Sequence, residues 1–387
     1  MQLKDRVEIK IESVAFGGAG VGRVNNFVVF VPFAAPDDEL EIEITQLKKK
    51  FARGKIVRIF KRSAVRVSPL CRYYEKCGGC CYQHINYAHQ LKIKKSQVAE
   101  AFKKIGKIAA PPVLDVIASP KIYNYRGKAQ LHTAQTASDG KIGFMDISGG
   151  EIVDIEYCEI MEDTINEKIS AWHQNKQLPC DKNTRLTIWS GQETGKNEPV
   201  VRAVREKDFL VPPGGFFQAN LYLTGSLVDE ICRLTQFEEL NTLIDAYCGS
   251  GLFSIFLASY AKNIIGIEKD EKSLKYACIN AENANVKNIQ FIRGNVEDIL
   301  PGKLLSSKNK IDMIILDPPR TGCGESVLKA IKDLCPRRVI YISCNPATQA
   351  RDVKYLNEQG YELLSLMPVD MFPQTEHIET IGLLALK

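Results

Sequence analysis

Leu243-Ile244-Asp245-Ala246-Tyr247-Cys248-Gly249-Ser250-Gly251 is an apolar run that leads into a glycine-containing turn. Four more apolar runs follow it, separated by stretches long enough for helices: Ile264-Ile265-Gly266-Ile267, Ile289-Gln290-Phe291-Ile292, Met313-Ile314-Ile315-Leu316 and Val339-Ile340-Tyr341-Ile342. Nearly continuous apolar strands that alternate with helices are typical of a parallel sheet covered on both faces. The sequence therefore predicts a doubly wound, Rossmann-like α/β domain over residues 241–387.

The turn after the first strand of such a sheet is where a ligand binds. Gly249 and Gly251 occupy this turn, where the backbone must approach a cofactor closely and needs positive φ. The third glycine of a dinucleotide fingerprint is absent, since Phe253 and Ser254 follow. This argues against a pyrophosphate-binding dehydrogenase and for S-adenosylmethionine, with Asp245 inside the same motif. An α/β core without any ligand is the alternative.

Polar residues at the ends of the next two strands fit the same cofactor. Glu268 ends the second strand, about 20 residues after the turn, where a carboxylate accepts hydrogen bonds from ribose hydroxyls. Asn295 and Asp298 follow the third strand, where a contact with adenine is expected. We predict that all three residues bind the cofactor.

A thiol and a carboxylate follow the last two parallel strands. Cys344 stands in Ser343-Cys344-Asn345-Pro346, and Asp317 in Leu316-Asp317-Pro318-Pro319-Arg320, a stiff loop at the cofactor edge. Most free cysteines are inert packing residues, but the position at a strand end favours a functional thiolate. Asp317 is placed to hold a substrate base.

A pyrimidine substrate explains why a methyltransferase would need a nucleophile. C5 of uracil reacts poorly with a methyl donor until a thiolate has added to C6, and the C5 proton must then leave. Glu379, in His377-Ile378-Glu379, is the candidate base, while His377 is more simply explained as a hydrogen-bonding residue. We therefore predict covalent catalysis by Cys344 and proton abstraction by Glu379.

Length and composition predict a multidomain protein. The 387 residues are 45% hydrophobic, enough for two or three cores. No apolar stretch reaches the roughly 20 residues that span a bilayer, and no apolar signal core follows the polar N-terminus. We expect a soluble, cytoplasmic monomer without a membrane partner.

Residues 1–62 combine alternating strands with a basic charge. Val7-Glu8-Ile9-Lys10-Ile11 and Glu41-Ile42-Glu43-Ile44 alternate with period two around a glycine-rich turn, which predicts a small antiparallel barrel. Residues 1–70 hold 13 Lys and Arg against 8 Asp and Glu, an excess equal to the net charge of +5. A barrel with a basic rim is an oligonucleotide-binding (OB) architecture. A barrel that only packs, with the charges as a solvated face, is the alternative.

Residues 63–240 read as a mixed α+β segment that begins with clustered cysteines. Cys71, Cys77 and Cys80 form a C-x5-C-x2-C pattern, in which several sulfurs can converge on one metal centre. Cys158 is a plausible fourth ligand, whereas Cys81 adjoins a ligand and is poorly placed. Spacing alone leaves zinc with four thiolates open.

Taken together, these motifs resemble the RNA uracil-C5 methyltransferases, in particular the ribosomal RNA members with an N-terminal TRAM domain and an iron–sulfur cluster. The resemblance covers essentially the full length. It implies a TRAM barrel over residues 1–62, a central domain over 63–240, of which residues 85–112 pack on the C-terminal domain, and a methyltransferase domain over 241–387. It also implies that Cys344 is the nucleophile and Glu379 the base.

The resemblance assigns further residues and the substrate. It implies that Cys71, Cys77, Cys80 and Cys158 hold a [4Fe-4S] cluster, which displaces zinc, and that Gln218 and Tyr247 join Glu268, Asn295, Asp298 and Asp317 near S-adenosylmethionine. We expect 5-methyluridine formation in 23S ribosomal RNA. The same chemistry on transfer RNA is one alternative, and a noncatalytic iron–sulfur protein that binds RNA is the alternative from another class.

Overall fold

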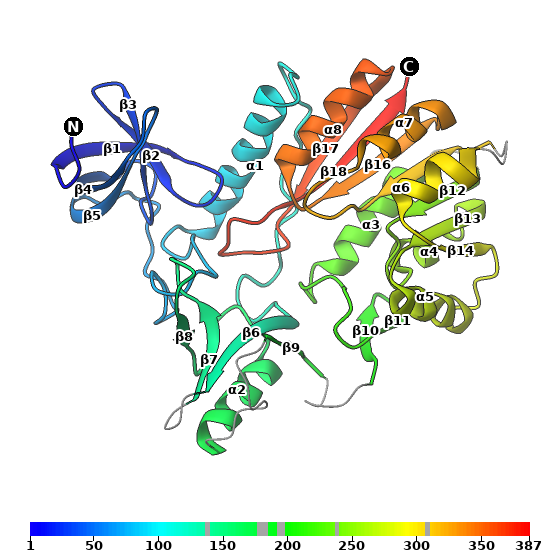
Figure 1. Cartoon of the computed structure of the whole chain (residues 1–387), viewed down its shortest axis with the longest axis horizontal. Coiled ribbons are helices and arrows are strands. Elements are labelled where there is room, and N and C mark those ends of the chain that lie inside the picture. The colour runs from blue at the N-terminus through cyan, green and yellow to red at the C-terminus, as the bar shows by residue number, and fades with distance from the viewer. Residues whose placement is uncertain (136–139, 176–184, 192–197, 237–239, 306–309) are drawn as a thin grey trace. The chain divides into compact units, whose positions relative to one another are not determined.

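The computed structural model describes the chain except residues 136–139, 176–184, 192–197, 237–239 and 306–309 (Figure 1). Its described residues fall into two compact units. The first unit comprises Met1–Gln97, Lys121–Ser190 and Phe372–Glu376, and the second comprises Val98–Pro120, Gly191–Met371 and His377–Lys387. The chain thus passes between the units after Gln97, Pro120, Ser190, Met371 and Glu376. The predicted domain boundaries near residues 62 and 240 stay a prediction.

The N-terminal part of the first unit is a small barrel, as predicted, and it is closed, with five strands in the order β1-β2-β3-β5-β4. Its strands are β1 (Arg6–Val14), β2 (Gly20–Val24), β3 (Phe27–Val31), β4 (Glu39–Leu47) and β5 (Ala52–Lys61). Alternate side chains such as Ile11, Val29 and Ile42 fill its interior. Neighbours pair antiparallel except β3 and β5, whose parallel pair completes the barrel.

The rest of the first unit is a four-stranded antiparallel sheet with one helix and a long segment that carries cysteines. The sheet has the order β8-β7-β6-β9, and its elements are β6 (Lys128–Gln135), β7 (Gly140–Met145), β8 (Ile152–Asp154), β9 (Arg185–Trp189) and α2 (Asp163–Asn175). Ile165 and Ile169 of α2 pack on Ala129, Leu131 and Ile188 of the sheet. This small core holds the strands next to Cys158.

A five-residue segment from near the C-terminus, Phe372–Glu376, belongs to the first unit. The carbonyl oxygen of Gln374 accepts hydrogen bonds from the N–H groups of Cys81 (3.1 Å) and Tyr82 (3.0 Å). The side-chain amide of Gln90 donates to Gln374 Oε1 at 2.9 Å and accepts from the Gln374 N–H at 3.1 Å. The cysteine segment is therefore hydrogen-bonded to residues that lie almost 300 positions later in the chain.

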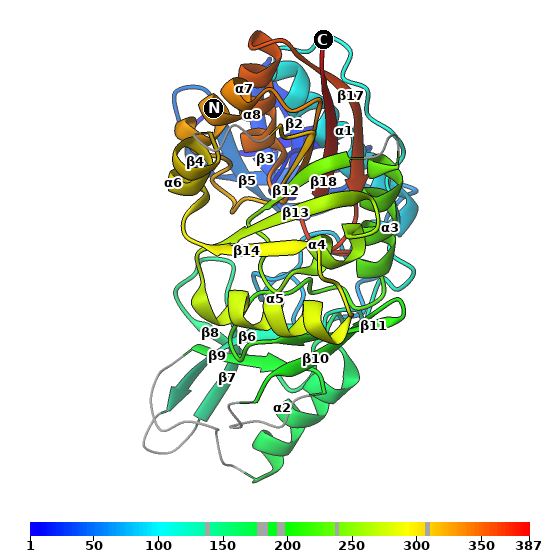
Figure 2. The ribbon, with the colours of Figure 1, turned by 90° about the vertical axis from the view of Figure 1, so that its right-hand side faces the viewer.

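The second unit is built on the predicted doubly wound sheet. Its seven strands, in spatial order, are β14 (Ile289–Arg293), β13 (Ala261–Glu268), β12 (Leu240–Ala246), β15 (Met313–Leu316), β16 (Arg338–Ser343), β18 (Glu379–Leu386) and β17 (Tyr361–Val369). The first five pair in parallel, with β14, β13 and β12 side by side at one edge (Figure 2), and β18 is antiparallel to β16 and β17. The five predicted apolar runs are the five parallel strands, so their carboxyl ends share one edge.

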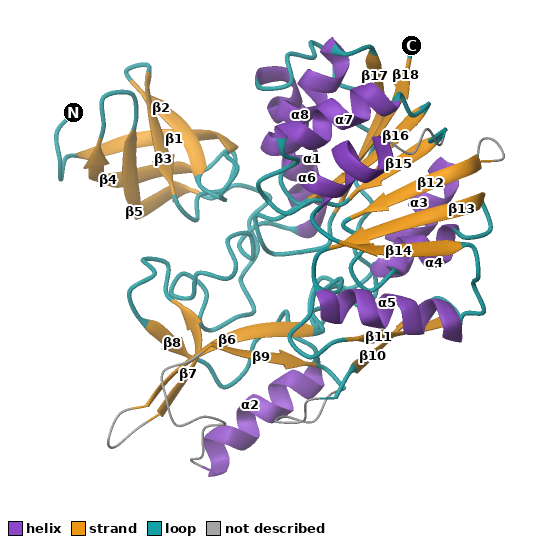
Figure 3. Cartoon of the chain, turned by 45° about the vertical axis from the view of Figure 1, so that its right-hand side comes forward, coloured by secondary structure: helices purple, strands orange, loops and turns teal. Residues whose placement is uncertain are grey.

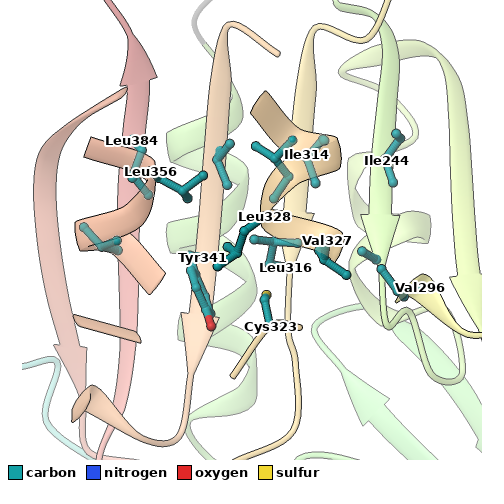
Figure 4. Packing of buried hydrophobic residues seen from close by; sticks show 14 of the residues in the cluster. Ile244, Val296, Ile314, Leu316, Cys323, Val327, Leu328, Tyr341, Leu356 and Leu384 are labelled. Carbon is teal, nitrogen blue, oxygen red and sulfur yellow. The ribbon is translucent and has the colours of Figure 1, made fainter. Parts of the chain in front are cut away.

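Helices cover both faces of this sheet (Figure 3). One face carries α1 (Tyr87–Lys104), α6 (Val296–Ile299), the following π-helical turn η1 (Leu300–Leu304), α7 (Glu325–Leu334) and α8 (Pro346–Glu358). The other carries α3 (Thr224–Thr235), α4 (Leu252–Leu257) and α5 (Glu271–Asn283), with the hairpin β10 (Val200–Val204) and β11 (Lys207–Val211) beside α5. Ile244, Ile314 and Tyr341 of the sheet pack with Val327 and Leu356 of the helices in one continuous core (Figure 4).

In the part of the chain that the structure describes, no helix is both long and apolar enough to cross a membrane.

Candidate active site

The turn between β12 and α4 has the backbone conformation that the sequence predicts. Tyr247, Gly249 and Gly251 have φ angles of +67°, +56° and +85°. A Cβ atom at Gly249 would meet nothing within 4 Å, so the glycine there is required by its φ and leaves open space above the turn. The Gly249 N–H donates to Glu268 Oε2 at 3.0 Å. The turn is therefore tied to the carboxylate that ends β13.

Asp245 lies beneath this turn and is fully buried. Its Oδ2 accepts hydrogen bonds from the N–H (2.8 Å) and hydroxyl (2.5 Å) of Ser254, whereas Oδ1 has no hydrogen-bond partner among the described residues. Burial raises the pKa of Asp245 to about 7. A buried oxygen without a partner is uncommon and is often found at functional sites.

The other predicted cofactor residues surround the same edge of the sheet. Besides Gly249, Glu268 accepts from the Asp270 N–H at 2.7 Å, and Asn295 precedes α6 and donates to Asp298 Oδ2 at 3.1 Å. The Tyr247 hydroxyl donates to Glu297 Oε1 at 2.9 Å. Glu297 was not selected from the sequence, because nothing in its local context indicates that it holds Tyr247. Gln218 is buried in the same unit, after β11.

Cys344 and Glu379 are brought together by the pairing of β16 with β18. Ser343, the last residue of β16, pairs with Thr380, so Cys344 and Glu379 are the next residues on the two neighbouring strands. Burial, followed by the charge of Glu379, raises the pKa of the Cys344 thiol to about 11. The Cys344 thiol is therefore largely protonated at neutral pH unless another group stabilises its thiolate.

Three acidic side chains crowd this edge. Glu379 is 8% exposed, and its burial, with a further contribution from the charge of Asp317, raises its pKa to about 8. Burial and the charge of Asp245 raise the pKa of Asp317 to about 7. Two carboxyl groups that titrate near neutral pH beside a thiol are typical of an acid–base site.

Arg320 supplies a positive charge that partly offsets the negative charges of these carboxylates. Its guanidinium lowers the pKa of both Cys344 and Glu379, although burial outweighs it at each group. The Arg320 carbonyl accepts hydrogen bonds from Asn345 Nδ2 and Thr348 Oγ1, each at 3.2 Å. The loop that carries Asp317 and Arg320 is thus held by the residues that follow Cys344.

Asp352 of α8 holds the far end of that loop. It is fully buried, and its Oδ2 accepts from the Tyr341 hydroxyl at 2.6 Å and from the Cys323 N–H at 2.9 Å. Gly322, with φ +78°, packs so closely that a Cβ atom there would lie 2.5 Å from Asp352 Oδ2. These contacts leave the loop little freedom, so Asp317 and Arg320 are preorganised.

Replacing Arg320 with glutamine should slow the reaction of Cys344 with iodoacetamide several-fold at mildly alkaline pH and low ionic strength. The substitution removes the charge that lowers the pKa of the thiol, so less thiolate is present. Mass spectrometry of the Cys344 peptide measures the rate. Arg293→Gln, which changes an exposed arginine paired with Glu271 in the same unit, is the matched control. Equal rates in all three proteins would show that the guanidinium does not act on the thiol.

The predicted cluster cysteines lie in the first unit and influence one another. Burial and the charge of Cys158 raise the pKa of Cys80, and burial, with smaller contributions from Cys77 and Cys71, raises that of Cys158 to about 12. The Gly78 N–H donates to the Met145 carbonyl at 3.0 Å, which attaches the cysteine loop to the end of β7. Among the described residues no group of three or more His, Cys, Asp or Glu side chains is arranged to hold a metal ion.

Two family models and several curated relatives match this chain. The family model for tRNA (uracil-5-)-methyltransferase matches residues 200–387, and the TRAM domain model matches residues 3–57. An uncharacterised RNA methyltransferase of Clostridium acetobutylicum is 31% identical over 443 residues, covering 97% of this chain and 96% of the relative. Another from Halalkalibacterium halodurans is 30% identical over 447 residues, covering 99% and 97%.

A solved structure extends the likeness to the whole fold. The tRNA (uracil-54, C5)-methyltransferase of Pyrococcus abyssi, in complex with S-adenosyl-L-homocysteine, superposes with a TM-score of 0.74 at 25% identity. The match covers 97% of this chain and 100% of that one. It therefore includes the barrel as well as the seven-stranded sheet.

Proposed function

Because this chain belongs to the RNA uracil-C5 methyltransferase family, we propose that it methylates C5 of a uridine in 23S ribosomal RNA through a covalent Cys344 intermediate. The observation that supports the mechanism is the pairing of Ser343 with Thr380, because it makes Cys344 and Glu379 the next residues on two neighbouring strands. A methyl acceptor carbon that must first be activated and then deprotonated needs a nucleophile and a base at one place.

The residues at the carboxyl edge of the sheet fit S-adenosylmethionine. The open space above Gly249 leaves room for a cofactor, and the buried Oδ1 of Asp245 beneath the turn has no hydrogen-bond partner among the described residues. We assign its binding to Gln218, Asp245, Tyr247, Gly249, Gly251, Glu268, Asn295, Asp298 and Asp317. When bound, S-adenosylmethionine supplies an electrophilic methyl group to C5 of the base.

Cys344 and Glu379 perform the two steps that belong to the protein. The Cys344 thiolate adds to C6 of uracil, so a sulfur–carbon bond forms and the electrons of the C5–C6 double bond move onto the C4 carbonyl as an enolate. After methylation, Glu379 accepts the C5 proton, the C5–C6 double bond forms again, and the thiolate leaves. A pKa of about 8 suits a base that exchanges protons near neutral pH. Arg320 favours the charged form of both groups.

The proposal also names the RNA that is methylated, 23S ribosomal RNA. Mass spectrometry of 5-methyluridine in 23S rRNA and in bulk tRNA, from cells with and without the gene, tests it directly. Loss of an rRNA mark supports the proposal. Loss of the tRNA mark alone would favour the second candidate, methylation of transfer RNA, the reaction for which the Pyrococcus abyssi enzyme is named. If both RNAs keep their marks, the proposed reaction is wrong.

We also propose that Cys71, Cys77, Cys80 and Cys158 hold a [4Fe-4S] cluster. Their thiols lie close enough that the charge of one raises the pKa of another, as Cys158 does for Cys80. One zinc ion draws its sulfurs to bonds of about 2.3 Å. Four cysteine thiolates would equally serve as the ligand set of a [4Fe-4S] cluster, which the family resemblance favours.

Cys158→Ser should lose the cluster. After anaerobic reconstitution, we expect the wild-type chain to retain iron and sulfide in equal amounts, and the variant to retain little of either. Colorimetric iron and sulfide analysis of the desalted protein measures both. Cys81→Ser is the matched control from the same segment and should keep the cluster. Loss in Cys81→Ser with retention in Cys158→Ser would contradict the assigned ligands.

A further inference from the structure

The first unit contains a cavity of about 570 Å³ whose walls are rich in phenylalanine. Phe16 comes from the β1–β2 turn, Phe30 and Phe33 from β3 and the residues after it, and Phe51 from just before β5. Cys80, one of the proposed cluster ligands, also lines the cavity. We call this cavity the phenylalanine pocket. Its volume lies within the range of about 300–1,000 Å³ that is typical of small-molecule sites. The residues that line it belong to the first unit, whereas the residues of the candidate active site belong to the second.

The β1–β2 turn holds Phe16 at the mouth of the pocket. The Ala15 N–H donates to the Ala19 carbonyl at 2.9 Å, and the Gly18 N–H donates to the Ala15 carbonyl at 3.0 Å. Gly18 packs so closely on Cys81 that a Cβ atom would lie 2.6 Å from its sulfur. Phe16 is nevertheless 51% exposed. A large aromatic ring on a fixed turn, exposed at a cavity, is suited to stacking with a ligand.

Basic residues lie beside the pocket and an acidic residue lies within its lining, a distribution that suits a nucleotide. Arg53 lines the pocket, and the exposed Lys48, Lys49 and Lys50 lie on the connection just before Phe51. None of these four cations forms an ion pair with a described residue. Glu376 is the one acidic residue in the lining. A carboxylate inside the pocket repels phosphate but accepts hydrogen bonds from ring and amino N–H groups.

We infer that the phenylalanine pocket binds an unstacked nucleobase of the RNA, with the adjoining phosphates on Lys48, Lys49, Lys50 and Arg53. Single-stranded RNA is held in this way by stacking on aromatic rings beside a basic track. Glu376 is placed to accept a hydrogen bond from the Watson–Crick edge of the base. The inference rests on the proposed RNA substrate and adds a second contact site for it.

Phe16→Ala should weaken binding of a fluorescein-labelled single-stranded RNA of about 12 nucleotides, a length that one OB-type barrel can cover. Stacking of one base on an aromatic ring is worth about 1–3 kcal/mol, so we expect about 5- to 150-fold weaker binding by fluorescence anisotropy. Phe60→Ala is the matched control, because Phe60 is 47% exposed on the same barrel but does not line the pocket. It should change the affinity less than twofold, and Phe16→Trp should restore it.

Salt dependence separates the stacking contact from the phosphate contacts. Phe16→Ala should leave the slope of log affinity against log salt unchanged, whereas Lys49→Ala should make it shallower by about one. Equal affinities of Phe16→Ala and Phe60→Ala would overturn the pocket assignment.

Methyl transfer to cellular RNA, assayed in parallel, distinguishes the two proposals. A wild-type chain that methylates RNA while Phe16→Ala binds normally would refute the pocket alone. Phe16-dependent binding without any methyl transfer would support the pocket and refute the enzyme's proposed reaction.

Discussion

Cys344→Ala should abolish methyl transfer and leave the binding of RNA and S-adenosylmethionine intact. The substitution removes the sulfur that adds to C6, and without this addition C5 remains too weak a nucleophile for the methyl group. Removal of a nucleophile in other enzymes costs up to about 10⁶-fold in rate. We expect a loss of at least about 10³-fold here. Cys344 is half-buried in the loop between β16 and α8, so the substitution removes only a small side chain from outside the regular strands and helices.

Transfer of a tritiated methyl group to RNA measures this loss, while anisotropy and equilibrium dialysis measure the two binding steps. Cys278→Ala is the matched control, because Cys278 is an exposed free cysteine on α5 of the same unit. It should keep the wild-type rate. Turnover by Cys344→Ala at a comparable rate would end the covalent mechanism, whereas loss of RNA binding would indicate a structural role for the thiol.

Glu379→Gln should convert the enzyme into a trap for its substrate. A glutamine amide cannot accept the C5 proton, so the methylated base stays attached to Cys344 after the transfer step. We expect turnover to fall by about 10²- to 10⁴-fold, the usual contribution of a general base. A protein–RNA adduct should accumulate on a denaturing gel, and it should be absent from the double variant Cys344→Ala with Glu379→Gln.

Glu362→Gln is the control for this experiment. Glu362 is an exposed carboxylate on β17, which pairs with the strand that begins at Glu379, and it is remote from Cys344 along that strand. It should turn over normally without an adduct. Normal turnover by Glu379→Gln, without an adduct, would assign proton abstraction to another group, and Asp317 would then be the candidate because its pKa is also raised to about 7.

The sequence predicts the sheet of the second unit well because each of its central strands is buried on both faces. A run such as Met313–Leu316 is apolar at every position and is bounded by polar residues, so it can be recognised locally. The alternating strands of the barrel are equally local signals. The closure of the barrel cannot be recognised locally, because it depends on the parallel pairing of β3 with β5, which are separated in sequence by β4.

The active site likewise combines features that are visible locally with one that is not. Cys344 and Glu379 each belong to a recognisable motif, but their proximity depends on the antiparallel register of β16 and β18. The role of Arg320 is not recognisable in the sequence, since its effect on the pKa values of Cys344 and Glu379 depends on three separate chain segments that meet in the fold. Glu297 was overlooked for the same reason.

The segment Phe372–Glu376 has a consequence for how this protein can be dissected and how it could have been assembled. A fragment that ends before Phe372 would leave the N–H groups of Cys81 and Tyr82 without the Gln374 carbonyl that accepts from both. Each buried polar group left unsatisfied costs about 1–3 kcal/mol. The cysteine-bearing unit is therefore not a portable module that gene fusion or truncation can transfer intact. Because Phe372–Glu376 directly precede the strand that begins at Glu379, the first unit has to be kept together with the C-terminal part of the chain.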